Sequence, residues 1–312
     1  MQKRVLGATG FEISVVGLGA WAIGGGGWEW GWGPQDDADS IAAIHRAVEL
    51  GVNWIDTAPI YGFGRSEEVV GRALGQISEK PYVFTKCGLE GRDGVGVNEL
   101  KAETIERQCE DSLRRLGVEA IDLYQIHWPD PEEDIDEGWA ACVALLSAGK
   151  VRHIGVSNFN VEQLRRANDL ATVETLQPPY SLINRGIEKE ILPYCAREKI
   201  GVIVYSPMAS GLLTGKFNAE RVAALPEDDF RSHAPHFQEP ALSGNLAAAE
   251  RLRELGERHG VSAGATAVAW TLRDPVVTGA IVGFRRAGQV EGILPAAGEL
   301  VLSAEEIAFV EG

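Results

Sequence analysis

Four side chains that can move protons follow successive apolar runs of the chain, namely Asp56, Tyr61, Lys86 and His127. A tyrosine can give a proton to a carbonyl oxygen if its pKa, ordinarily about 10, is brought toward the working pH. A nearby ammonium would lower that pKa by stabilising the phenolate, and a carboxylate would keep the ammonium charged and in place. A histidine could orient the carbonyl or share the proton. The set is an acid–base site without an obvious nucleophile or metal, so a cofactor would have to supply the reducing equivalent.

Each of these residues also has a purely structural interpretation. Asp56 with Thr57 could cap a helix, because both residue types accept hydrogen bonds from a first helical turn. Lys86 could be the solvated end of a strand, His127 a satisfied core histidine and Tyr61 a surface aromatic. Residues that follow consecutive parallel strands converge on one end of a barrel, however, and this convergence favours the functional interpretation.

The elements that must position these residues alternate between strands and helices. Apolar, β-rich runs begin near residues 16, 52, 81, 120, 151, 173, 201 and 277, and helical periodicities separate most of them. Strict alternation predicts an α/β protein with a parallel sheet. Eight units in a chain of this length favour one closed (β/α)8 barrel of the TIM type, forming a single domain over residues 1–312.

Two segments fall outside this alternation. A β-hairpin is expected over Lys3–Val16, with Val5 and Leu6 paired against apolar residues of its second arm. The interval between the last two strands is long, and it holds a polar, proline-rich stretch (225–240) and an extra helical run over 245–259. The barrel is therefore expected to carry an N-terminal hairpin and extra helices in its C-terminal half.

The composition restricts the class of protein. Lysine and arginine number 29 and aspartate and glutamate 45, so the net charge is 29 − 45 = −16, which disfavours nucleic acid or an anionic membrane as a partner. No apolar run reaches the about 18 residues of a membrane span, and Met1–Phe11 lacks the apolar core of a signal peptide. The four cysteines show neither CxxC nor metal-ligand spacing, so they are expected to be reduced, mostly buried thiols of a cytoplasmic protein without a metal.

One segment imitates a dinucleotide-binding fingerprint. Gly17–Ala22 matches the relaxed pattern GxGxxA, and acidic residues follow about 20 positions later. That fingerprint requires a helix directly after the first glycines, whereas this chain continues with four more glycines, Gly24–Gly27, which cannot open one. Gly24–Gly33, which contains three tryptophans, is better interpreted as a flexible aromatic loop over the barrel mouth.

The ordered motifs of the chain resemble those of the aldo-keto reductases, most closely a bacterial, general-stress-protein-like branch. The resemblance covers essentially the whole chain. The motifs are Asp56-Thr57-Ala58-x-x-Tyr61-Gly62-x-Gly64-x-Ser66-Glu67, the FTKCG segment around Lys86, the YQIHWPD segment around His127, Gly155–Phe159, Gln177–Ser181, Tyr205–Lys216 and Gly283–Gln289.

The resemblance implies a carbonyl reductase, or an alcohol dehydrogenase working in reverse, that binds NADP(H) in an extended pose without a Rossmann domain. By this resemblance Tyr61 is the proton donor, Lys86 and Asp56 tune it, and His127 orients the carbonyl. The rivals are a catalytically weak, NADP(H)-binding auxiliary subunit of the same fold and a barrel hydrolase or lyase, since fold alone does not determine function. The expected partner is a small molecule, and the expected assembly is a monomer or weak oligomer.

The resemblance also assigns a cofactor site. Side-chain amides and hydroxyls would hold the nicotinamide, backbone amides and a lysine would line the pyrophosphate, and an arginine pair would favour NADP(H) through its 2′-phosphate. From the nicotinamide to the 2′-phosphate, these residues are Ser157, Asn158, Gln177 and Tyr205; Ser206, Pro207, Met208, Ser210, Gly211, Leu212 and Lys216; and Gly283, Arg285, Arg286 and Gln289. Family members often carry Glu-Asn shortly after the position of Gln289, where this chain has Gly292-Ile293, which weakens the expected adenine contact.

The substrate side of the site is expected to be aromatic. Residues on loops that face the barrel mouth would line it, and they are Trp21, Trp28, Trp30, Trp32, Ile60, Phe63 and Trp128. Such a mouth suits apolar or aromatic aldehydes and ketones, and stacking of a sugar on the tryptophans is equally compatible with it.

Overall fold

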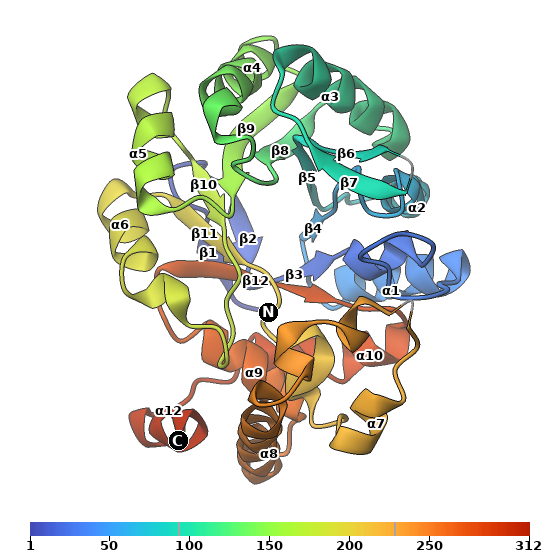
Figure 1. Ribbon diagram of the computed structural model, residues 1–312, viewed down its shortest axis with the longest axis vertical. Coiled ribbons are helices and arrows are strands. Elements are labelled where there is room, and N and C mark those ends of the chain that lie inside the picture. The colour runs from blue at the N-terminus through green and yellow to red at the C-terminus, as the bar shows by residue number, and fades with distance from the viewer. Residues whose placement is uncertain (93, 228) are drawn as a thin grey trace.

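Eight parallel strands form a closed barrel in the computed structural model, which describes residues 1–92, 94–227 and 229–312 (Figure 1). All eight strands begin within two residues of the positions expected from the sequence, and the (β/α)8 TIM-barrel prediction is confirmed. In their order around the barrel the strands are β3 (Val16–Gly19), β4 (Trp54–Asp56), β5 (Tyr82–Cys87), β8 (Ile121–Ile126), β9 (Val151–Ser157), β10 (Thr175–Gln177), β11 (Gly201–Val204) and β12 (Val277–Gly283).

Helices surround the barrel, as Figure 1 shows. Local sequence explains several of their ends: the Asp36 carboxylate caps the first turn of α1, and Gly117 ends α3 in the left-handed conformation that glycine adopts at little cost. The helices are α1 (Asp37–Glu49), α2 (Arg65–Leu74), α3 (Ala102–Leu116), α4 (Ile135–Ser147), α5 (Val161–Leu170), α6 (Ile191–Glu198), α7 (Ala219–Ala223), α8 (Ala241–His259), α9 (Ala263–Thr271), α10 (Ala287–Glu291), α11 (Leu294–Ala297) and α12 (Ala304–Glu311).

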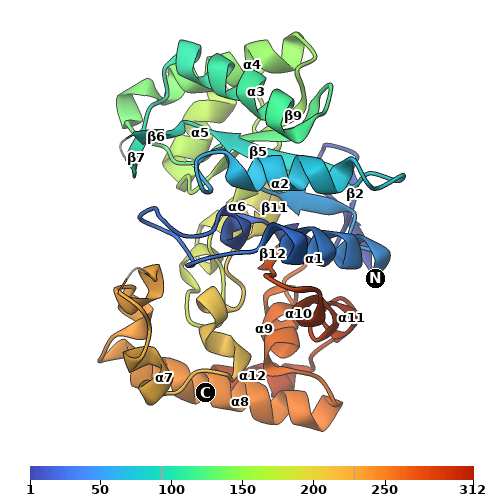
Figure 2. The same ribbon diagram turned by 90° about the vertical axis from the view of Figure 1, so that its right-hand side faces the viewer.

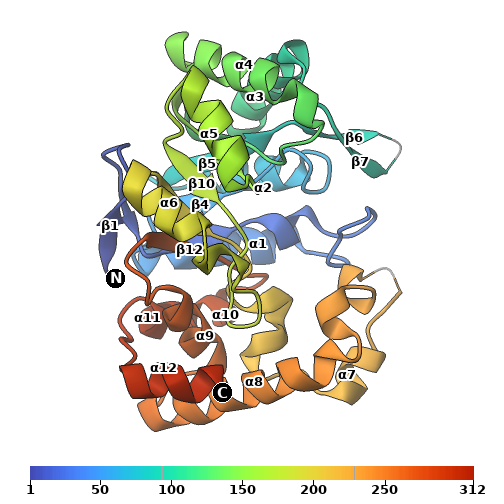
Figure 3. The same ribbon diagram turned by 60° about the vertical axis from the view of Figure 1, so that its left-hand side comes forward.

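Two short hairpins stand at opposite ends of the barrel (Figure 3). The N-terminal one pairs β1 (Lys3–Val5) with β2 (Glu12–Ser14), which confirms the expected hairpin. The expected pairing of Val5 with an apolar residue is wrong. Val5 lies opposite Glu12 and is 54% exposed, whereas Leu6 is buried. The other hairpin pairs β6 (Leu89–Arg92) with β7 (Val95–Asn98).

The interior of the barrel is apolar at the end that carries the N-terminal hairpin and polar at the opposite end. Leu6 and Ile13 pack against Trp54, Phe84 and Leu123 to fill the lower layer. Because side chains alternate along a strand, the interior position two residues after each of these strand residues lies one layer nearer the mouth. Those positions are polar, namely Asp56 after Trp54, Lys86 after Phe84 and Gln125 after Leu123.

The expected C-terminal additions are present. The long interval between β11 and β12 contains α8, which starts at Ala241 rather than at residue 245 and packs against α9 (Figure 2). The 225–240 stretch folds into the short 3₁₀ turns Phe230–Ser232 and Pro235–Phe237, and residue 228 within it lies outside the described residues.

The structure also bears on two expectations from the composition. All four cysteines are buried and none is in a disulfide. Within the described ranges, no helix has both the length and the apolar character needed to cross a bilayer.

Candidate active site

The residues Asp56, Tyr61, Lys86 and His127, here called the tetrad, meet at the C-terminal end of the barrel. Lys86 Nζ lies 2.6 Å from Asp56 Oδ1 and donates a further hydrogen bond of 3.0 Å to the Thr57 carbonyl oxygen. The two side chains meet because they come from the neighbouring strands β4 and β5, and both are buried. Burial lowers the pKa of Lys86, and Asp56 opposes that change by favouring the ammonium.

Tyr61 lies on the turn between β4 and α2, with Lys86 Nζ 5.3 Å from the centre of its ring. The expectation that the ammonium lowers the tyrosine pKa is not met. Burial, followed by the charge of Asp56, raises the pKa of Tyr61 well above its ordinary value. The phenol therefore retains its proton at neutral pH, as a proton donor must.

His127 follows β8 and faces Tyr61 edge to face, with ring centres 5.9 Å apart. Burial lowers the pKa of His127 well below its ordinary value, and the neighbouring Lys86 acts in the same direction. The imidazole is therefore neutral at pH 7, so it can donate a hydrogen bond to a carbonyl oxygen without carrying a charge.

Two buried polar residues beside the tetrad were missed by the sequence reasoning. Glu67 accepts hydrogen bonds from Thr85 (2.6 Å) and from Arg115 on the outer side of β5. Gln125, inside the barrel, places Nε2 3.4 Å from Asp56 Oδ2. The sequence holds a signal for Gln125, because an amide stands at an interior position two residues before His127, but this position lies before the end of the strand, where the other candidate residues were predicted.

The residues expected to hold a nicotinamide carboxamide lie together on β9 and β10 and just beyond them. Ser157 Oγ donates to the Gln177 carbonyl oxygen (2.7 Å), and Asn158 Nδ2 donates to the His127 carbonyl oxygen (3.0 Å). The Tyr205 hydroxyl donates to Asn158 Oδ1 (2.9 Å), which holds the ring beside this group. These contacts join the expected cofactor residues to the tetrad.

A turn after β11 forms the next part of the site. Ser206, Ser210 and Gly211 have left-handed backbones, with φ of 56°, 54° and 92°. Backbones of this kind turn successive N–H groups toward one side and are typical of anion-binding sites. Ser206, Pro207, Met208, Ser210, Gly211 and Lys216 line the cavity described below. The Leu212 side chain is fully buried in the core, so the group of this residue that remains a prediction for the site is its backbone amide.

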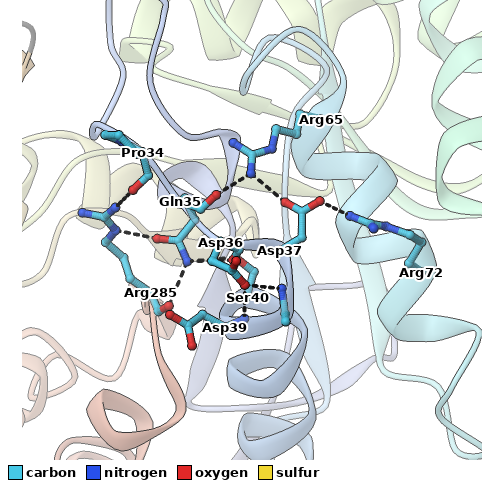
Figure 4. A network of polar contacts seen from close by, with 10 residues as sticks. Pro34, Gln35, Asp36, Asp37, Asp39, Ser40, Arg65, Arg72 and Arg285 are labelled. Carbon is cyan, nitrogen blue, oxygen red and sulfur yellow. Dashed lines mark hydrogen bonds and ion pairs between the residues drawn. The ribbon is translucent and has the colours of Figure 1, made fainter.

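The far end of the site is rich in arginine. The Arg285 guanidinium donates to Gln35 Oε1 (2.6 Å) and to the Pro34 carbonyl oxygen (Figure 4). The Arg286 side chain is 77% exposed. Arg231, from the 225–240 stretch, lies over the Trp32 ring at 4.7 Å. The pKa of Arg285 is lowered chiefly by burial and further by the charge of Arg231. Arg231 was not anticipated from the sequence.

Gln289 supports this arginine pair from the start of α10. Its Oε1 accepts hydrogen bonds from the backbone N–H groups of Arg285 (2.8 Å) and Arg286 (3.2 Å). Gly283, at the end of β12, also lines the cavity. The segment after β12 is therefore held in shape by its own side chains.

The expected substrate residues form an aromatic wall over Tyr61, with one exception. Trp21 Nε1 donates to the Trp30 carbonyl oxygen (3.1 Å), and Trp28 Nε1 donates to the Gly25 carbonyl oxygen (3.1 Å). The residues of the expected set that line the cavity are Trp21, Trp28, Trp30, Trp32, Ile60 and Trp128.

Phe63 is the exception. It is 45% exposed and has a left-handed backbone (φ 55°), and its ring lies across Gly91 of β6, where a Cβ would come within 2.1 Å of it. The aromatic wall includes other residues that sequence reasoning missed: Phe230 packs against Trp21 with ring centres 4.9 Å apart, and Leu89 of β6 lines the cavity.

One elongated cavity of about 1180 Å³ connects these parts. It runs from Tyr61 and His127, past the amides and the left-handed turn, to Arg285 and Arg286. Polar amides, an anion-binding turn and a cationic end, in this order, fit the nicotinamide, the pyrophosphate and the phosphorylated adenosine of a dinucleotide. The residues present therefore suit such a cofactor.

Comparison with known proteins agrees with this geometry. The sequence model described as the Aldo/keto reductase family matches residues 16–312. Aldo-keto reductase YhdN of Bacillus subtilis is 40% identical over 296 residues, which cover 94% of this chain and 88% of the relative. The NADH-specific methylglyoxal reductase of Escherichia coli is 35% identical over 287 residues, covering 88% and 86%.

Solved structures show the same relationship. The glycerol dehydrogenase AKR11B4 from Gluconobacter oxydans superimposes with a TM-score of 0.88 at 43% identity, over 99% of this chain and 93% of that one. Aldo-keto reductase AKR11C1 from Bacillus halodurans, in its holo form, has a TM-score of 0.79 at 25% identity, over 100% and 95%. The chain belongs to the aldo/keto reductase family of oxidoreductases.

Proposed function

We propose that this protein is an NADP(H)-dependent oxidoreductase that interconverts carbonyl compounds and alcohols by hydride transfer, with Tyr61 as the proton donor. One observation carries the proposal. The buried Asp56–Lys86 ion pair lies beside a protonated Tyr61, with a neutral His127 facing the same phenol, on the wall of the elongated cavity. This arrangement can protonate a carbonyl oxygen without a metal ligand or a nucleophile.

Each residue of the tetrad has a separate role in one proton transfer. The nicotinamide, when bound, supplies or accepts the hydride. His127 donates a hydrogen bond that orients the carbonyl oxygen, and Tyr61 delivers the proton to that oxygen. The Lys86 ammonium stabilises the phenolate that develops, and Asp56 keeps the ammonium charged and in place. The same residues serve alcohol oxidation when Tyr61 acts as the base.

The preference for NADP(H) over NAD(H) is supported by the arginines at the far end of the cavity. Arg231, Arg285 and Arg286 line this end, where Asp229 pairs with Arg231 (2.6 Å) and Asp39 lies 3.4 Å from Arg286, so three guanidinium groups stand against two carboxylates. Guanidinium groups match the geometry of a phosphate, so this end suits the 2′-phosphate of NADP(H). One relative is named as NADH-specific, and the preference must therefore be measured for this chain.

Consumption of NADPH with a panel of aldehydes and ketones tests the proposal. Tyr61→Phe removes only the hydroxyl, and we expect it to lower kcat by about 10²-fold or more, the usual contribution of a general acid. Tyr82→Phe is the matched control, since Tyr82 stacks on Phe11 at the end of the barrel that carries the N-terminal hairpin. This variant should retain wild-type activity. Full activity of Tyr61→Phe would refute the assignment of the proton donor. Wild-type protein that binds NADPH but turns over no carbonyl would support the auxiliary-subunit alternative.

A further inference from the structure

Gln125 is a fully buried amide in the barrel interior with no role in the proton transfer described above. It lies on β8, where its Cα pairs with that of Lys86 on β5, and it precedes His127 by two residues. Because side chains alternate along a strand, Gln125 lies on the same inner face as His127, one layer deeper. A buried amide requires hydrogen-bond partners, and the partners of Gln125 are two residues of the candidate site.

These partners are Asp56 and Gln177. Lys86 occupies Asp56 Oδ1, whereas Oδ2 accepts a hydrogen bond of 2.8 Å from Gln177 Nε2 and has Gln125 Nε2 at 3.4 Å. Gln177 Nε2 also donates to Gln125 Oε1 at 3.2 Å. An ionised carboxylate can only accept, so the Gln177 amide must present its NH₂ group toward Asp56.

The Gln125 carbonyl accepts from this same NH₂ group. The two N–H groups of Gln177 are thereby used inside the barrel, and no described residue donates to Gln177 Oε1. Gln177 itself lines the cavity. Its Oε1 is therefore left as an acceptor for a ligand, at the position where the carboxamide NH₂ of a nicotinamide is expected.

We propose that Gln125 is a positioning residue that, together with Asp56, holds the Gln177 amide in the orientation in which Oε1 faces the nicotinamide site. The inference rests on the proposed function, because it concerns the cofactor assigned there. The same contacts place the Asp56 carboxylate between the nicotinamide site and Lys86. Gln125 thus connects the acceptor for the cofactor to the ion pair beside Tyr61, although it touches neither the cofactor nor the substrate.

Gln125→Met tests this role, since methionine has a similar length but neither accepts from Gln177 nor donates to Asp56. Without the Gln125 carbonyl, the Gln177 amide keeps its Asp56 acceptor but loses the second acceptor that holds its NH₂ group inside the barrel. We expect the Kd for NADPH to rise about tenfold, the effect of losing one hydrogen bond of ordinary net strength. The Kd for 2′-phospho-ADP-ribose, which lacks the nicotinamide, should stay unchanged.

Two further variants separate this role from simple destabilisation. Gln177→Met should cause the same selective loss, and the double variant should bind NADPH no more weakly than Gln177→Met alone, because the two residues act through one amide. Gln108→Met is the matched control: Gln108 is a buried glutamine outside the cavity that bonds to Gly88 N and the Leu89 carbonyl oxygen. It should lower the melting temperature without changing the ratio of the two dissociation constants.

The outcomes are distinct. Wild-type protein that does not bind NADPH would contradict the proposed function before any variant is compared. The role of Gln125 alone would be overturned if the wild-type protein binds NADPH and Gln125→Met leaves the ratio of the Kd values for NADPH and 2′-phospho-ADP-ribose unchanged. That ratio is also unchanged if the variant binds both ligands equally more weakly. Should Gln125→Met fail to fold, Gln125→Asn keeps a neutral amide but is one methylene shorter and withdraws from Gln177, so it is expected to show the same selective loss for NADPH, and an unchanged ratio would overturn the inference.

Discussion

Gln35 Oε1 accepts a hydrogen bond of 2.6 Å from Nε of Arg285, although 250 positions separate the two residues in the chain. Gln35 Nε2 donates back to the Arg285 carbonyl oxygen (2.9 Å), so the two residues hold each other by side chain and backbone (Figure 4). The carbonyl oxygen of Gln35 accepts from Arg65 at the start of α2. Gln35 therefore ties the segment before α1 to the cationic end of the cavity and to the helix that follows Tyr61.

The first prediction concerns which arginine selects the cofactor. Gln35 and the Pro34 carbonyl occupy the Arg285 guanidinium, whereas Arg286 is 77% exposed and makes a longer contact of 3.4 Å with Asp39. Arg286 is therefore the freer partner for a 2′-phosphate. Arg286→Ala should raise the Kd for NADPH by about 10- to 100-fold, the range for a charged hydrogen bond, and leave the Kd for NADH nearly unchanged. Titration of both cofactors by fluorescence checks this. Equal effects on NADPH and NADH would remove Arg286 from that role.

The second prediction concerns the stability that Gln35 provides. Gln35→Leu removes the two side-chain contacts to Arg285, and we expect the free energy of unfolding to fall by about 1–2 kcal/mol. In a double-mutant cycle with Arg285→Ala, the two losses should not add, with a coupling of about 0.5–1.5 kcal/mol. Urea unfolding of the four proteins measures this coupling. Additive losses would mean that the contact contributes no coupling energy in solution.

The third prediction follows from the opposite pKa changes of Tyr61 and His127. The pKa of Tyr61 is raised, so the phenol keeps its proton at pH values above its ordinary pKa of about 10. The pKa of His127 is lowered, so the imidazole stays neutral at pH values below its ordinary pKa of about 6.5. The chemical step of reduction should therefore be nearly independent of pH between these limits. Alcohol oxidation should accelerate as the pH rises, because it requires the Tyr61 phenolate. Single-turnover rates in both directions test this, and an inflection of the reduction rate near pH 6.5 would contradict a neutral His127.

The fourth prediction concerns the buried ion pair. Lys86→Met leaves the Asp56 carboxylate buried without its counter-charge, and loss of one partner of such a pair typically costs about 3–5 kcal/mol. Combining it with Asp56→Asn removes that charge, so the double variant should be more stable than Lys86→Met alone. Both proteins should lose most of their reductase activity. A double variant that is less stable than Lys86→Met would show that the carboxylate is not the source of the destabilisation.

The sequence by itself determined the architecture and most of the residues of the candidate site. Eight apolar runs, most of them separated by helical periodicities, predicted the barrel, because burial on both faces of a parallel strand leaves a local pattern. The ends of those runs identified the tetrad, and the ordered motifs identified the amides, the turn after β11 and the arginine pair. Each of these signals is contained within a few consecutive residues.

Only the tertiary structure decided which partners these residues have and which charge states they adopt. Leu212 and Phe63 belong to the expected motifs, yet one side chain enters the core and the other lies on Gly91. The Tyr61 pKa rises, contrary to expectation, because burial and then the charge of Asp56 raise it, and burial depends on every surrounding element.

The contacts that organise the site join residues far apart in the chain. Asp56 meets Gln177 across 121 positions, and Gln35 meets Arg285 across 250. Periodicity shows which face of a strand a residue occupies, but the closure of the barrel decides what lies opposite that face. For this reason the sequence placed Gln177 among the expected cofactor residues, and only the folded chain revealed its contact with Gln125.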